Sequence, residues 1–181
     1  MLGFGEHHRT SCDSGIGIFI RKEGMTMQIR LARQSDLEDI NKLLYQVHKV
    51  HSDGRPDIFR PGNKKYTDEE LAGIIDDGKR PIFVGVIDNH VAGYAFCMFV
   101  EHTGESSLTD IRTLYIDDLC VDEKLRGQHI GRELYEYVLS FAKEEGCHNL
   151  TLNVWACNPA AMRFYESCGL SVQKIGMEQI L

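Results

Sequence analysis

The sequence is short of the features that mark membrane proteins and nucleic-acid binders. Among its 181 residues, the longest apolar runs, such as 91–100, reach about half of the roughly 20 residues needed to span a bilayer. No Lys/Arg cluster exceeds a few residues and the formal net charge is −7, whereas phosphate neutralisation needs a basic face. We therefore expect no membrane or nucleic-acid partner, and an acidic surface that favours cationic acceptors.

The cysteines also lack the spacing of a metal site or of a disulfide framework. There is no C-x-x-C pair, and no histidine lies close to them at metal-ligand spacing. Most of them occupy apolar contexts, where a free cysteine behaves as a small buried hydrophobic residue. We expect no bound metal and reduced thiols, in a cytoplasmic protein. The cysteines are Cys12, Cys97, Cys120, Cys147, Cys157 and Cys168.

The first 26 residues differ from the rest of the chain. They show neither the pattern of a signal peptide nor helical periodicity, whereas a regular alternation of polar and apolar residues begins after Met27. We interpret residues 1–26 as an N-terminal extension or leader and residues 27–181 as one domain. The alternative is that residues 15–21, which include a short apolar run, form a genuine extra strand.

Hydrophobic periodicity predicts strands and helices in a fixed order. Ser35 and Thr67 each have a glutamate three residues later, the capping-box pattern that begins a helix, and Asn158 precedes Pro159 at the start of another. The order predicts an α/β fold of the α+β type, with a mixed, mostly antiparallel central sheet and helices on both faces. The expected strands are 28–32, 82–87, 91–100, 113–121, 150–154, 170–175 and 177–181, and the expected helices run from Ser35 to about Gly54, from Thr67 to about Gly78, from Ile130 to Gly146 and from Asn158 to Gly169.

Residues 121–131 connect an expected strand to an expected helix through a glycine-containing turn. Such a turn aims backbone N–H groups outward at a helix N-terminus, which carries about half a positive charge and suits a pyrophosphate. The turn is neither a Walker A loop nor a G-x-G-x-x-G motif. From glycine content alone, an ordinary connection between a strand and a helix is the favoured interpretation.

A second motif, Asn158-Pro-Ala-Ala-Met-Arg-Phe-Tyr-Glu-Ser-Cys-Gly-Leu170, follows the next strand. Together with Arg126-x-x-His129-x-Gly131, about 30 residues earlier, it resembles the GCN5-related N-acetyltransferases (GNAT family), and the resemblance covers residues 27–181. In that family the turn reads Arg/Gln-x-x-Gly-x-Gly/Ala. His129 replaces the central glycine, and its Cβ limits how closely the backbone approaches a pyrophosphate, although the imidazole could add a donor.

The resemblance implies acetyl-CoA as a co-substrate. Strands 113–121 and 150–154 would splay apart at their ends, and the pantetheine arm would lie in the gap and pair with the backbone of the first strand. Backbone N–H groups of the turn would hold the pyrophosphate. The cofactor-binding residues that follow are Leu119, Cys120 and Val121 on the strand, Arg126, Gly127, Gln128, His129, Ile130, Gly131 and Arg132 at the turn, and Asn158 and Arg163 on the last helix.

Two residues are candidates for catalysis. Tyr165 matches a family position beside the thioester sulfur, where a phenol can give a proton to the departing thiolate; the alternative is a packing tyrosine. Asp117 matches an acidic position in polyamine acetyltransferases that helps to deprotonate the amine; the alternative is a strand-edge carboxylate. Period-2 alternation predicts that Asp117 shares the face of Leu119 and Val121, with Asp118 on the other face.

These assignments predict an N-acetyltransferase that moves an acetyl group from acetyl-CoA to the primary amine of a small molecule, by direct attack in a ternary complex. A protein N-terminal or lysine acetyltransferase and a non-catalytic acyl-CoA-binding regulatory domain remain alternatives. The oligomeric state stays open, with a homodimer among the options. The residues expected to border the acceptor pocket are His48, His51, Arg55, Asp57 and Phe59.

Overall fold

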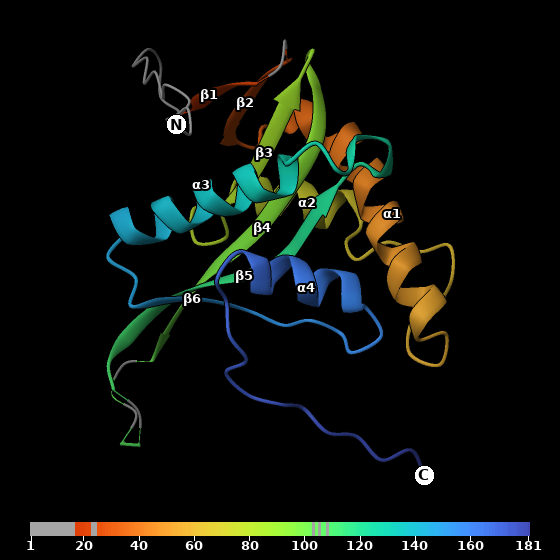
Figure 1. Cartoon of the computed structure of the whole chain (residues 1–181), viewed down its shortest axis with the longest axis vertical. Helices are drawn as coiled ribbons and strands as arrows, with labels where there is room; N and C mark the ends of the chain where they lie inside the picture. Colours follow the sequence, from red (N-terminus) through yellow and green to blue (C-terminus); the bar gives the residue numbers. More distant parts are fainter. Residues whose placement is uncertain (1–16, 23–24, 103, 105, 108) are drawn as a thin grey trace.

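The computed structural model describes residues 17–22, 25–102, 104, 106–107 and 109–181. These residues form six strands and four α helices, drawn in chain order in Figure 1. The strands are β1 (Ile18–Lys22), β2 (Met25–Leu31), β3 (Ile82–Ile87), β4 (His90–His102), β5 (Ile111–Val121) and β6 (Asn149–Leu152), and the α helices are α1 (Leu37–Gly54), α2 (Asp68–Ile75), α3 (Ile130–Glu144) and α4 (Pro159–Ser167).

All six described strands join one sheet in the order β1-β2-β3-β4-β5-β6. Neighbouring strands are antiparallel except for β5 and β6, which run parallel. The hairpin of β3 and β4 turns at Asp88 and Asn89, both with positive φ, as its two-residue connection requires. The predicted mixed and mostly antiparallel sheet is therefore confirmed.

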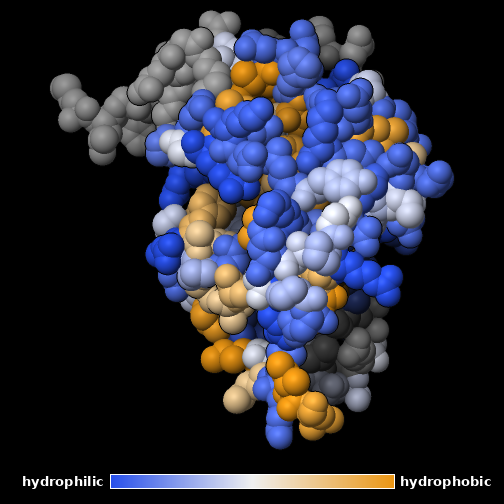
Figure 2. Space-filling model, turned by 90° about the vertical axis from the view of Figure 1, so that its right-hand side faces the viewer, coloured by the Kyte–Doolittle hydropathy of each residue, from blue (hydrophilic) through white to orange (hydrophobic). Residues whose placement is uncertain are grey.

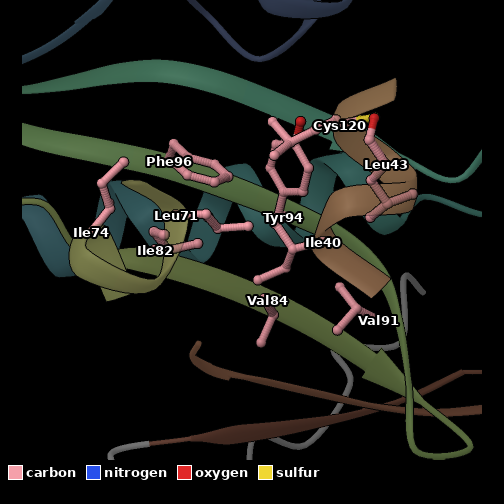
Figure 3. Close-up of a cluster of buried hydrophobic side chains, with 11 residues drawn as sticks. Ile40, Leu43, Leu71, Ile74, Ile82, Val84, Val91, Tyr94, Phe96 and Cys120 are labelled. Atoms are coloured by element: carbon pink, nitrogen blue, oxygen red, sulfur yellow. The ribbon is translucent and has the colours of Figure 1, made fainter. Parts of the chain in front are cut away.

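Helices cover both faces of the sheet (Figure 1). On one face, Ile40 of α1 and Leu71 of α2 pack around Tyr94 of β4 in a fully buried cluster (Figure 3). On the other face, a second cluster includes Val138 of α3, which is fully buried against β4 and β5. Phe164 of α4 packs against this second cluster. This two-layer cover holds the sheet rigid and leaves the ends of its strands to form a site.

The start of α1 differs from the prediction. Ser35 lies inside a short 3₁₀ turn, Gln34–Asp36, and α1 begins at Leu37. The Asp36 carboxylate accepts a hydrogen bond from the Arg33 backbone N–H at 2.8 Å and pairs with Arg30 at 2.6 Å. The predicted capping box at Ser35 is wrong, because a partly buried ion pair anchors this turn instead.

The capping box predicted at Thr67 is confirmed. The Thr67 hydroxyl accepts a hydrogen bond from the Glu70 backbone N–H at 3.1 Å, and the Glu70 carboxylate accepts one from the Thr67 backbone N–H at 2.8 Å. This reciprocal pair fixes the point at which the long loop between α1 and α2 ends. The loop is important below because its last residues contact β5.

The two ends of the chain also differ in part from expectation. β1 pairs with β2, so the alternative of an extra strand accounts for Ile18–Lys22, while residues 1–16 lie outside the described residues and their interpretation stays a prediction. The strands predicted at 170–175 and 177–181 are wrong. Ile175 and Met177 are 81% and 94% exposed, so no burial offsets the entropy of ordering a strand there.

The C-terminal segment, which follows α4, instead extends away from the sheet at one end of the molecule (Figure 1). Figure 2 shows hydrophobic side chains gathered at this same end, where Ile180 and Leu181 are exposed. Glu178 ties the segment to the end of α1 through an ion pair with Arg55 at 2.8 Å.

No helix in the described part of the chain is both long enough and apolar enough to cross a membrane.

Candidate active site

The site is built where β5 and β6 separate. Their parallel pairing runs from Thr113 opposite Asn149 to Ile116 opposite Leu152, and β6 ends there. β5 continues to Val121 with β4 as its one strand partner among the described residues. The predicted splay is therefore present, and the outer edge of β5 beyond Ile116 keeps backbone N–H and C=O groups available for a ligand.

A β-bulge lies at the point of separation. Phe96 of β4 is opposite Asp118, whereas the next residue, Cys97, is opposite Ile116, so Asp117 has no opposite residue. An inserted residue resets the alternation of side chains along a strand. The prediction that Asp117 shares a face with Leu119 and lies opposite to Asp118 is therefore wrong, and both carboxylates lie toward the side covered by α1 and α2.

Asp117 is held by the end of the loop between α1 and α2. Its Oδ2 accepts hydrogen bonds from Lys65 Nζ and from Tyr66 Oη, both at 2.6 Å. The Tyr66 ring stacks on Phe96 with centroids 5.6 Å apart, so the loop is anchored to the sheet. Burial and the Asp117 charge raise the pKa of Tyr66, which keeps its hydroxyl a donor. These two donors fix the direction of the Asp117 carboxyl group.

Asp118 occupies a drier environment than its neighbour. The Tyr94 hydroxyl donates a hydrogen bond to its Oδ2 at 2.8 Å. Tyr94 itself belongs to the buried cluster beneath β5 (Figure 3). Burial, together with the negative charge of Asp117, raises the pKa of Asp118 to about 6 against the opposing effects of Tyr94 and Lys65. A buried carboxyl group with a raised pKa beside a strand edge is a feature common at catalytic sites.

Tyr165 approaches the splay from the opposite side, on α4. Asn158 caps this helix as predicted, its side-chain oxygen accepting from the Ala161 backbone N–H at 3.1 Å. The Tyr165 ring packs against Phe164 and Tyr135, with centroids 5.0 and 6.5 Å away. Burial raises the pKa of Tyr165, and the charge of Asp118 raises it further. The phenol is therefore held protonated, the state that a proton donor needs.

The turn before α3 has the geometry of an anion-binding loop. Gly127 and His129 both have positive φ, 83° and 66°, and His129 directly precedes the first residue of α3. The backbone N–H groups that begin α3 are then directed outward beside the end of β5. His129 makes no side-chain cap of the helix, so its imidazole is not used to close the turn. This geometry fits a pyrophosphate.

The arginines predicted to contact phosphate have different surroundings. Arg126 Nε donates to the Val121 carbonyl at 3.3 Å, which closes the turn on β5. Arg132 donates to the Ser167 carbonyl at 2.7 Å and so links α3 to α4, while Arg163 is exposed on α4. Arg132 therefore has a structural role in addition to any contact with phosphate.

Cys120 is a candidate cofactor-binding residue through its backbone groups alone. Its side chain is buried in the cluster beneath α1, where Sγ lies 3.6 Å from the Leu43 carbonyl oxygen. Burial raises the pKa of its thiol to about 12. The thiol is inert at neutral pH, and the ligand-facing groups of Leu119, Cys120 and Val121 are those of the backbone.

Four rings, His48, His51, Phe59 and Trp155, form an aromatic cluster between α1 and the segment that leads to α4. Phe59 is the centre, with centroids 5.3 Å from His51, 5.9 Å from His48 and 5.2 Å from Trp155. Burial lowers the pKa of His51, and the charges of His48 and Lys65 lower it further. Lys65, whose charge contributes to this shift, also donates to Asp117. Trp155 was missed by sequence reasoning, although it directly follows the predicted strand 150–154.

Comparison with known proteins identifies the family. Residues 44–170 match the acetyltransferase (GNAT) family, a span that includes β5, the turn before α3, and α4. The chain belongs to the GNAT family. Glucosamine 6-phosphate N-acetyltransferase from Arabidopsis thaliana is 32% identical over 65 residues, which are 36% of this chain and 42% of that protein.

Two further similarities agree with this assignment to the GNAT family. Thialysine N-epsilon-acetyltransferase from Bos taurus is 33% identical over 79 residues, 44% of each chain. Both alignments thus span less than half of the relative's length. Among solved structures, a mutant of the BH1408 protein from Bacillus halodurans has a TM-score of 0.81 at 32% identity, and the match covers 84% of this chain and 98% of that one.

This GNAT chain brings most of the sequence-predicted site residues to one end of β5. Asp117 and the backbone of Leu119–Val121 lie at the splay, and the turn before α3 follows, whereas Tyr165 packs with Leu119 against the cluster on the α3 side of the sheet. Sequence reasoning missed Lys65, Tyr66 and Tyr94, whose contacts depend on the path of a loop and on the bulge. No local pattern signals either feature.

Proposed function

We propose that this protein transfers the acetyl group of acetyl-CoA to the primary amine of a small molecule, within a ternary complex. The observation that carries the proposal is the end of β5. There, an open strand edge, a bulged and hydrogen-bonded Asp117 and the anion-binding turn before α3 follow one another along the chain. Amine acetylation needs a site for the pantetheine arm, a base for the amine and a site for the pyrophosphate, and we assign these to the three features in that order.

Residues 27–181 form the proposed acetyltransferase domain, to which β1 adds an edge strand. When bound, acetyl-CoA supplies an acetyl thioester. The backbone of Leu119, Cys120 and Val121 pairs with the pantetheine arm, and N–H groups of residues 126–132 hold the pyrophosphate. At α4, Asn158 contacts the pantetheine and Arg163 contacts phosphate.

Asp117 acts as the base in this proposal. A primary ammonium has a pKa of about 10, so freeing its lone pair at neutral pH takes about 4 kcal/mol. Asp117 attracts the ammonium and accepts its proton, directly or through water. A backbone N–H on the open edge of β5 polarises the thioester carbonyl, and the protonated Tyr165 gives a proton to the leaving sulfur.

The names of the curated relatives support a small amine as acceptor. They are glucosamine 6-phosphate and thialysine acetyltransferases, so in both the acceptor is the amine of a small molecule. Lys65 donates to Asp117, and its charge also lowers the pKa of His51 in the aromatic cluster; a carboxylate and aromatic rings both suit a cationic amine. The net charge of −7 favours the approach of such a cation.

The test combines ligand binding with turnover. Acetyl-CoA should raise the melting temperature by mass action, and a panel of amines, aminoglycosides and peptides should release CoA with small amines as the best acceptors. Gly131→Val should weaken the thermal response to acetyl-CoA without unfolding the domain. A Cβ at Gly131 lies in ordinary contact with Val121 and Phe164, at 3.4 and 3.5 Å, so the backbone can keep its fold.

Gly73→Val is the matched control for that variant. Gly73 is also a helical glycine, on α2, with no atom within 4 Å of an added Cβ. Equal stabilisation of both variants by CoA would contradict the turn assignment. A wild-type protein that shows neither a thermal response to acetyl-CoA nor CoA release with any amine would overturn the proposed function.

A further inference from the structure

One amine of the protein already lies where the acceptor amine is needed. Lys65 Nζ is 2.6 Å from Asp117 Oδ2, the carboxylate that deprotonates the acceptor under the proposed function, on which this inference rests. The Lys65 side chain is 41% exposed and Asp117 is 17% exposed, so the ammonium reaches into the site from outside. Its position over the Tyr66 ring, 5.4 Å from the centroid, steadies it there.

We propose that Lys65 is itself an acceptor, and that the chain acetylates its own Lys65 Nζ when acetyl-CoA is present without an external amine. Proximity makes the step intramolecular, because the nucleophile and its base are already in hydrogen-bond contact. The structure gives no other lysine this contact, within the described residues.

The step balances as follows. The Lys65 ammonium gives one proton to Asp117, and the freed lone pair on Nζ forms a C–N bond with the thioester carbonyl carbon. The C–S bond breaks, and its electron pair leaves on sulfur as the CoA thiolate. Tyr165 gives its proton to that thiolate and regains one from solvent, which takes up the second proton from Nζ, and Asp117 returns its own proton to solvent. The products are an Nζ-acetyl-lysine, free CoA and one proton.

The adjacent lysine gives a control within the same loop. Lys64 Nζ pairs with Asp68 and with the Asn41 side-chain oxygen, and the Lys64 side chain is 15% exposed. It therefore lies in contact with α1 and α2 and away from Asp117. Lys64 and Lys65 are adjacent and of the same chemical type, but they differ in exposure and in contact with the base.

The experiment incubates the full chain with acetyl-CoA alone, and maps acetylated lysines by mass spectrometry over time. Wild type and Lys64→Arg should gain one acetyl group on Lys65, whereas Lys65→Arg should gain none at this peptide. Asp117→Asn should slow the modification by roughly a hundredfold or more, because its base is lost. The initial rate per chain should not change with protein concentration, as an intramolecular reaction requires.

The inference is overturned if Lys64 is modified as fast as Lys65, or if the rate per chain rises in proportion to protein concentration. It is also overturned if an external amine releases CoA from the same sample while Lys65 stays unmodified, and in that case the proposed function stands. Absence of both a thermal response to acetyl-CoA and CoA release would count against the proposed function and the inference together.

A measurement without acetyl-CoA tests the contact on which the inference depends. By NMR, the Lys65 ammonium protons should exchange slowly with solvent in the free wild-type protein and rapidly in Asp117→Asn. The Lys64 ammonium should be unaffected by that change. Equally rapid exchange of the Lys65 ammonium in both proteins would overturn the inference at its starting point.

Discussion

The two halves of β5 differ in how completely the sheet uses them. Residues 111–116 have β4 on one edge, and from Thr113 onward β6 on the other, with Leu114 and Ile116 buried. Residues 117–121 have β4 alone, and they begin with a bulge that turns Asp117 toward a lysine and a tyrosine. The paired half stabilises the fold. The half with an open edge has backbone groups that no described strand pairs with on that edge, and it follows without a break in the same strand.

The largest expected effect comes from removing the charge that distinguishes the open half. Asp117→Asn is nearly isosteric but loses the base and the attraction for an ammonium, so turnover should fall about a hundred- to ten-thousandfold at neutral pH. The rate should partly recover as pH rises toward the amine's own pKa of about 10, because solvent then supplies the neutral amine. Steady-state rates against pH measure this effect.

Asp39→Asn is a suitable control for the Asp117 variant. Asp39 is also an ion-paired carboxylate, bound to Lys42 at 2.9 Å, but it lies on α1 and not on β5. It should keep the wild-type pH profile. If Asp117→Asn kept it as well, together with the wild-type rate, Asp117 would not be the base and the bulge would have only a structural role.

Tyr165→Phe should have the next largest effect. It removes one hydroxyl from the donor that faces the open half, so the chemical step should slow by roughly ten- to a thousandfold with acetyl-CoA affinity nearly unchanged. Single-turnover rates separate this effect from product release. Tyr135→Phe is the matched control, because Tyr135 packs against Tyr165 and is buried on α3. An unchanged single-turnover rate in Tyr165→Phe would leave that residue a packing role.

Asp118→Asn probes the neighbour that the bulge brings to the same side. Its pKa of about 6 in the folded protein exceeds its ordinary value of 3.8, so the folded state binds the proton more tightly than the unfolded state. Stability therefore falls as pH rises through this window, and at about pH 8 the ionised group costs roughly 3 kcal/mol. The amide can still accept the hydrogen bond from Tyr94, so the variant should be more stable than wild type at that pH.

Denaturant unfolding at several pH values measures this difference. The gap between the variant and wild type should be small near pH 4 and should widen toward pH 6, because only wild type carries the titrating group. A gap that stays constant with pH would show that Asp118 does not titrate differently in the folded state. In that case burial would not raise the pKa of Asp118 in the way its surroundings indicate.

Local signals predicted much of the fold. Thr67 with Glu70 and Asn158 with Pro159 each marked a helix start through contacts within a few residues, and the structure has both. The capping box at Ser35 failed because Asp36 pairs with Arg30 across the end of β2. The local pattern at Ser35 is as good as the one at Thr67, but it does not include the ion pair between Arg30 and Asp36.

The site was predictable to the extent that it depends on chain order. The end of the pairing between β5 and β6 was implied by the family resemblance and is present, whereas the roles of the turn before α3 and of Tyr165 stay predictions. The direction of Asp117 could not be predicted, since a bulge depends on the register between β4 and β5, which no single-strand pattern specifies. The contact of Lys65 depends on a loop path, and the absent C-terminal strands depend on a partner that an alternating sequence does not itself supply.

The smallest expected effect concerns the turn that the open half of β5 leads into. His129 has a φ of 66°, a left-handed conformation in which a side chain is strained, so His129→Gly should relieve the strain. The greater freedom of glycine in the unfolded chain offsets part of the gain, and we expect a rise of about 1 kcal/mol or less in the free energy of unfolding. Without the Cβ, acetyl-CoA should bind a few-fold more tightly, on the order of 1 kcal/mol.

His129→Ala separates the backbone from the imidazole in that prediction. Alanine keeps the Cβ and its strain but removes the ring, so its stability should stay near that of wild type and its acetyl-CoA affinity should not rise. Chemical denaturation and calorimetric titration of the three proteins measure both quantities. If glycine and alanine weakened acetyl-CoA binding equally, the imidazole would be a direct ligand. The histidine would then add a donor at a turn whose backbone already favours an anion. Anion binding at this turn would depend on a side chain, where we expect the backbone N–H groups to suffice.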